Sequence, residues 1–128
     1  MTSAVCRALI AALCVLLAAF FAFVGWNKAF ASLADLATYG AWTVHLPEWA
    51  GRLVGWSEMA LAAGLLAVFV PRHRSVARWS ALLLIANQAV AALVHLNRGE
   101  TAALPQNGVL IALLALVALA IAPKGPKP

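Results

Sequence analysis

The fold of this chain is decided by residues 49–70, which read WAGRLVGWSEMALAAGLLAVFV. As an α-helix, this stretch would be about 33 Å long, enough to cross the roughly 30 Å hydrocarbon core of a bilayer. A helix satisfies its backbone hydrogen bonds internally, as lipid requires of a spanning segment. The stretch therefore predicts a transmembrane helix, and this helix carries one acid, Glu58, near its middle.

Three further stretches have the same apolar character, at residues 8–26, 79–96 and 104–122. The chain is 65% hydrophobic and 10% charged, against roughly 45–50% and about 25% in soluble proteins. We therefore expect one all-α domain over residues 1–128, a polytopic membrane four-helix bundle surrounded by the lipid bilayer. The net charge of +5 comes from scattered Lys and Arg without a basic helix face, so no nucleic-acid partner is expected.

Positive charge is distributed unevenly over the predicted loops. Residues 71–78 contain three arginines and no acid, which predicts a cytoplasmic loop by the positive-inside rule. Alternation then places both termini on the same side, which holds six Lys and Arg against three on the other. We expect a multi-pass protein of a bacterial-type plasma (inner) membrane with cytoplasmic N- and C-termini.

The connection between the first two spans, residues 28–48, is neither apolar enough to cross nor rich in Gly and Ser. Phe30, Leu33 and Leu36 recur in it at helical spacing. This pattern predicts a short amphipathic helix between spans 1 and 2, which either caps the bundle or lies on the membrane surface.

A cleaved signal peptide is a second interpretation of the first span, because Arg7 precedes it and residues 29–31 have the form of a cleavage site. The apolar run of residues 8–24 is longer than the roughly 7–15 residues typical of such peptides. Four retained spans are therefore favoured.

Glu58 is the most informative residue, because an acid at the centre of a helix in lipid costs about 2.5–3.5 kcal/mol or more. Gly51, Gly55 and Ala62 share its helix face. This stripe of small residues allows another helix to approach closely. Glu58 is therefore expected to face protein.

Polar residues of the third span lie at matching depth. Counting inward from the span ends places Asn87 level with Glu58, with Gln88 adjacent and about 100° away, so either amide can meet the acid. Gln88 and His95 share a face that runs from the midplane towards the outer surface. These residues predict a pocket that binds a small ligand or relays a proton. The alternative is that they only hydrogen-bond the helices together.

Other polar residues receive simpler interpretations. Lys28 and Arg52 start near the outer surface, and we expect their side chains to extend to water there. Asn107 is interpreted as a helix-end residue and His45 as a loop histidine without polar partners. No Cys and His cluster has metal-ligand spacing, so no metal site is expected.

Short motifs follow one another along the chain in a recognisable order. They are Gly25-Trp26-Asn27-Lys28, Pro47, Gly55-Trp56-Ser57-Glu58 with Gly64-Leu65-Leu66, His95, and Pro105-Gln106-Asn107-Gly108-Val109-Leu110. In this order they resemble the DoxX-like family of small four-helix membrane proteins over nearly the whole chain. The resemblance implies that Lys28 and Glu58 belong to the polar signature of the family and that His95 is its late histidine.

Some members of that family are subunits of thiosulfate:quinone oxidoreductases, and others accompany redox or maturation systems. The resemblance thus implies a subunit or accessory of a quinone-linked or other redox system, with a membrane or redox partner protein. Its lipophilic-ligand pocket would comprise Glu58, Asn87, Gln88, His95 and Lys28, and would hold a quinone or another lipophilic molecule, so the sequence leaves the cofactor open. The chain lacks a haem-ligand pair and a flavin fingerprint, so electron transfer by this chain alone is not expected.

Two other function classes stay open, and the sequence does not decide whether the chain is an enzyme. The small-residue faces also suit a non-enzymatic membrane assembly or scaffold subunit. A proton-coupled small-molecule exporter is less favoured, because the first span carries no acid.

Overall fold

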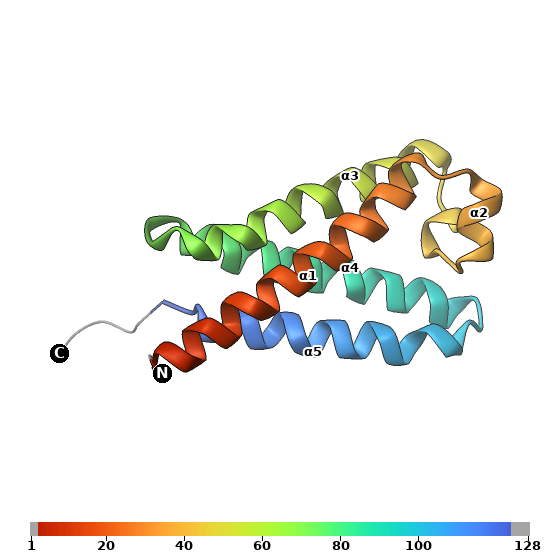
Figure 1. Ribbon diagram of the computed structural model, residues 1–128. Helices are drawn as coiled ribbons and strands as arrows, with labels where there is room; N and C mark the ends of the chain where they lie inside the picture. Colours follow the sequence, from red (N-terminus) through yellow and green to blue (C-terminus); the bar gives the residue numbers. More distant parts are fainter. Residues whose placement is uncertain (1–2, 124–128) are drawn as a thin grey trace.

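Four long helices form the structure, a computed structural model that describes residues 3–123 (Figure 1). Each is long and apolar enough to cross a bilayer, so the predicted all-α four-helix membrane bundle is confirmed. The spans are α1 (Ala4–Phe30), α3 (Glu48–Leu65) with the 3₁₀ turn η2 (Leu66–Phe69), α4 (Arg74–Asn97) and α5 (Leu104–Ala120). The 3₁₀ turns η3 (Pro71–His73) and η4 (Thr101–Ala103) precede α4 and α5.

The observed helices differ from the predicted spans at their ends. The first begins at Ala4 rather than residue 8, because the Ser3 hydroxyl accepts a hydrogen bond from the Cys6 amide and caps the helix. The second span ends in η2, where Val70 is extended as expected of a residue before proline. Local capping thus adds turns that hydropathy does not reveal.

The closest helix contact joins α1 to α3 at Gly25 and Gly55. A Cβ atom on Gly55 would lie 2.6 Å from the Gly25 carbonyl oxygen and 2.5 Å from the Ala29 amide nitrogen. The two backbones therefore approach to a distance that only glycine permits. Lys28 follows Gly25 by one turn of α1, and Glu58 follows Gly55 by one turn of α3. The close packing of the two helices lets these side chains meet.

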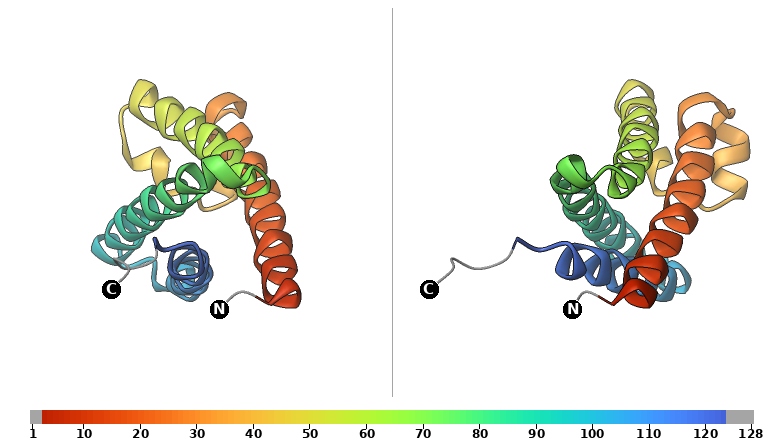
Figure 2. Two further views of the ribbon diagram at one scale, coloured as in Figure 1. Left: turned by 90° about the vertical axis from the view of Figure 1, so that its left-hand side faces the viewer. Right: turned by 60° about the vertical axis from the view of Figure 1, so that its left-hand side comes forward.

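The bundle consists of two helix pairs, α1 with α3 and α4 with α5 (Figure 2). Phe21, Leu65, Leu84 and Leu114 are fully buried and join all four helices in one core. Helix α1 lies near α5 at the end that carries the N-terminus and diverges from it towards the other end (Figure 1). The divergence leaves room between the pairs at the end that carries α2, called the α2 end below.

A short cap closes that room at its end. It consists of α2 (Leu33–Thr38) and the 3₁₀ turn η1 (Trp42–His45). Leu36 and Trp42, which belong to the cap, are buried, whereas Leu33 is exposed and Phe30 still belongs to α1. The sequence predicts that this segment either caps the bundle or lies on the membrane surface. In the structure it caps the bundle.

The α1–α3 contact yields a stability prediction. Gly55→Ala is expected to lower the free energy of unfolding by roughly 1–3 kcal/mol, because the new Cβ meets backbone atoms on α1 that cannot move independently. Thermal unfolding in mild detergent measures the effect. Gly108→Ala is the matched control, since a Cβ there meets nothing within 4 Å. Equal stability of the two variants would contradict the close contact.

Candidate functional site

A buried ion pair links α1 to α3. Lys28 Nζ donates to Glu58 Oε1 over 2.7 Å, and the two residues are 8% and 0% exposed. Glu58 faces protein, as its small-residue stripe predicts. The expectation that Lys28 extends to water is wrong, because the glycine contact places a carboxylate closer to it than the surface and each charge compensates the other.

Glu58 Oε2 and Asn87 Nδ2 are both buried and neither has a hydrogen-bond partner. The Gln88 side chain points elsewhere and accepts a hydrogen bond from Asn107. On the other side of the ion pair, Lys28 Nζ lies 5.8 Å from the centre of the Trp42 ring. Lys28 is thus held between a carboxylate and an aromatic face.

Arg52 fixes the end of α1 above this pair. Its Nη1 donates to the carbonyl oxygens of Lys28 and Ala31 over 3.0 and 2.6 Å, and its Nη2 lies 3.3 Å from Glu48 Oε1. Carbonyls at a helix C-terminus have no partner within the helix, and an arginine can satisfy them. The expectation that Arg52 extends to water therefore misses its role as a clamp on the helix that carries Lys28.

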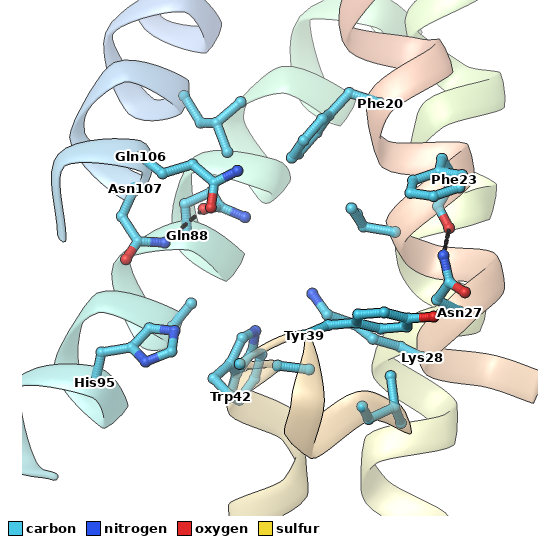
Figure 3. Close-up of a pocket in the computed structure, with 16 residues that line it drawn as sticks. Phe20, Phe23, Asn27, Lys28, Tyr39, Trp42, Gln88, His95, Gln106 and Asn107 are labelled. Atoms are coloured by element: carbon cyan, nitrogen blue, oxygen red, sulfur yellow. Dashed lines mark hydrogen bonds between the residues drawn. The ribbon is translucent and has the colours of Figure 1, made fainter. Parts of the chain in front are cut away.

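A cavity of about 390 Å³ lies beside Lys28, between α1, α4, α5 and the cap (Figure 3). Its volume falls within the roughly 300–1,000 Å³ of small-molecule sites. Its polar wall includes Asn27, Lys28, Gln88, His95, Gln106 and Asn107, and its apolar wall includes Phe20, Phe23, Val24, Leu36 and Leu110. Of the five predicted pocket residues, Lys28, Gln88 and His95 lie on this wall, while Glu58 and Asn87 lie behind it.

Two buried polar atoms on residues of the wall have no protein partner. Asn107 Nδ2 donates to Gln88 Oε1 over 2.9 Å, which leaves Asn107 Oδ1 unpaired. The indole Nε1 of Trp42 is also unpaired. Asn107 lies in the first turn of α5, in agreement with its interpretation as a helix-end residue, and its side chain also joins α5 to α4. Trp42 Nε1 is thus an unpaired donor beside the cavity, whereas Asn107 Oδ1 points away from it (Figure 3).

His95 connects the cavity to the α2 end. Its Nδ1 lies 3.1 Å from Glu100 Oε1, and the same oxygen lies 3.3 Å from His45 Nε2. His45 thus has polar partners, contrary to the sequence interpretation, because the cap folds it onto the loop between α4 and α5. The hydrogen bond with His95, aided by His45, holds the pKa of the Glu100 carboxyl below its usual range.

Within residues 3–123, no group of His, Cys, Asp and Glu is arranged to hold a metal ion. His45 Nε2 and His95 Nδ1 both contact Glu100 Oε1, so these three residues form a hydrogen-bonded cluster. Only His95 was identifiable from the sequence, since the other two lie in loops whose position depends on the fold.

These features define a class: a small four-span membrane protein with a polar cavity near one end of the bundle and a buried ion pair beside it. Residues 12–117 match the DoxX-like family. The chain therefore belongs to the DoxX-like family, and the resemblance drawn from its motifs is confirmed. Neither the curated proteins nor the solved structures include a significant match to it.

The ion pair yields a second stability prediction. Glu58→Ala is expected to cost about 3–5 kcal/mol, because it leaves the Lys28 charge buried and unpaired. The double variant Lys28→Met with Glu58→Leu is expected to unfold less easily than Glu58→Ala, since it retains side-chain volume without a charge. Free energies of unfolding in mixed micelles provide the comparison. A double variant with a lower free energy of unfolding than Glu58→Ala would refute the ion pair.

The depressed pKa of Glu100 predicts an acid-dependent loss of stability. The ionised carboxylate contributes fully above the pKa of an unfolded glutamate, about 4.3, and the contribution disappears as the pH falls through the lower folded value. The melting temperature of wild type should therefore exceed that of Glu100→Gln near neutral pH. The gap should close in acid, and a gap that stays constant down to about pH 3 would contradict this linkage.

Proposed function

We propose that this DoxX-like protein binds the ring of a small lipophilic molecule of the quinone type in the cavity beside Lys28, and does so for a redox partner protein in the membrane. The observation that carries the proposal is the cavity wall itself. It combines aromatic and aliphatic side chains with the unpaired indole N–H of Trp42 and the polar side chains of Lys28, Gln88 and His95. From the charge distribution, we place the protein in a bacterial-type plasma membrane with cytoplasmic termini.

A quinone ring suits the polar groups of the wall. Its oxygens accept hydrogen bonds, and Trp42 Nε1 and Lys28 Nζ are donors on the same side of the cavity (Figure 3). The Lys28 ammonium has three donors, of which the Glu58 contact uses one. Phe20 and the Trp42 ring supply aromatic surface for the ring faces.

The size and openness of the cavity also support a ligand with an apolar tail. At about 390 Å³ the cavity holds a ring, while a long tail must extend beyond it. Phe23 and Tyr39 belong to its wall and yet are 69% and 67% exposed, which marks its mouth. Since Phe23 lies well inside the spanning helix α1, its exposed side faces acyl chains. A ligand can therefore enter from lipid and leave its tail there.

The chemistry that remains for this chain is binding and orientation. Electron transfer requires a redox-active cofactor, which a partner protein would carry. Holding Lys28 in an ion pair keeps the net charge of the wall near zero, which favours an uncharged polar ring over an anion. A scaffold subunit without a ligand is the alternative, and it requires none of the unpaired groups of the wall.

Binding of a short-chain benzoquinone to the protein in lipid nanodiscs tests the proposal. Ala91 is buried on the cavity wall, and Ala91→Phe should fill the cavity and weaken binding at least tenfold, or about 1.4 kcal/mol. Ala89→Phe, on the exposed face of the same helix, is the matched control and should bind as wild type does. Trp42→Phe should weaken binding about 2- to 10-fold by removing one donor.

Calorimetry or photo-crosslinking with an azido-quinone reads out these affinities. If wild type binds neither the quinone nor its hydroquinone, or if Ala91→Phe binds the ring as tightly as wild type, the proposed function is wrong. Crosslinks at Trp42 or Lys28 would support it.

A further inference from the structure

His95 stands at the boundary between the cavity and the water-exposed α2 end. Its ring is 6% exposed and belongs to the cavity wall, while its Nδ1 contacts Glu100. The Glu100 side chain is 43% exposed and lies outside the wall. A single imidazole therefore separates the interior of the cavity from a carboxylate in contact with water.

Glu100 decides which nitrogen of His95 carries the proton. An ionised carboxylate can only accept hydrogen bonds, so Nδ1 must be the donor. In the neutral ring Nε2 is then unprotonated and can accept. Nε2 has no hydrogen-bond partner in the described part of the chain, and the ring projects towards the cavity (Figure 3). The wall thus presents a basic nitrogen as well as the donors of Lys28 and Trp42.

This arrangement distinguishes two forms of the same ring. The oxidised form of a quinone offers only acceptors, and it leaves Nε2 unsatisfied. The reduced form offers hydroxyl groups, each of which can accept from Trp42 or Lys28 and donate to Nε2. A site built to pair with a hydroxyl group discriminates strongly against an analogue that lacks it.

We infer that the cavity selects the reduced, hydroxylated form of its ligand, a hydroquinone-type ring, and that His95 Nε2 accepts the proton of a hydroxyl group. The inference rests on the proposed function and names the ligand form. Glu100 is a positioning residue, because it acts through His95 rather than on the ligand.

The proton path that follows is balanced and involves no electrons. As the ligand O–H bond breaks, an N–H bond forms at Nε2, and the ring becomes an imidazolium ion. Glu100 stabilises that ion through the existing hydrogen bond, accepts the Nδ1 proton and passes it to water. Other ionisable groups also face this path. His45 contacts the same Glu100 oxygen, Lys28 lies on the cavity wall, and Glu58 lies behind that wall.

A matched pair of ligands tests the inference on the full chain in nanodiscs: a short-chain hydroquinone and its dimethyl ether. Wild type should bind the hydroquinone at least tenfold more tightly near about pH 8. Glu100→Gln should reduce the preference at high pH, since an amide can donate to Nδ1 and shift the proton to Nε2. Arg98→Gln, an exposed change in the same loop, should retain it.

A tautomer measurement separates positioning from a merely structural role. ¹⁵N NMR of histidine-labelled protein should show His95 protonated at Nδ1 in wild type and at Nε2 in Glu100→Gln. A contact that only stabilises the loop would change the melting temperature and leave the tautomer unchanged, which would overturn the inference.

The binding outcomes also separate this inference from the proposed function. Equal affinity for hydroquinone and ether, with binding of both, would overturn the selectivity and leave the cavity as a ring-binding site. Absence of binding by hydroquinone, ether and oxidised quinone alike would overturn the proposed function together with the inference.

Discussion

The Lys28–Glu58 ion pair is the interaction on which the rest of the structure depends. Neither charge is tolerated alone in the interior of a bilayer, so each fixes the position of the other. The pair forms because Gly25 and Gly55 let two backbones touch. The register of α1 against α3 follows from this combination of close packing and charge. Since Arg52 also holds the end of α1, the helix that carries Lys28 is fixed at both its side chain and its backbone.

The cavity arises from the way the two helix pairs are assembled. The pairs converge on one core near the N-terminus and separate towards the α2 end, where a uniform bundle would have filled its interior (Figure 1). The cap closes this space at the α2 end without filling it, because Leu36 and Trp42 cover that end. Polar residues of α4 and α5 can then line a cavity inside the bundle instead of facing lipid.

Much of the fold and part of the site could be predicted from the sequence. Span number, the inward orientation of Glu58 and the small-residue face follow from the cost of polarity in lipid, which acts on each helix separately. The partners of Lys28, His45 and Asn107 could not be predicted, because they belong to segments distant in the chain. A lysine near a membrane surface extends to water unless a carboxylate lies nearer. Tertiary packing decides whether such a carboxylate is present.

The position of Phe23 at the mouth of the cavity has a consequence for affinity. A molecule that reaches the site from the acyl chains is already concentrated there by partitioning, far above its level in water. A site fed from such a two-dimensional pool needs little intrinsic affinity to be occupied, and weak binding permits rapid exchange with the pool. Discrimination must then come from the few polar groups at the inner wall, since every lipophilic molecule in the membrane shares the same route of access.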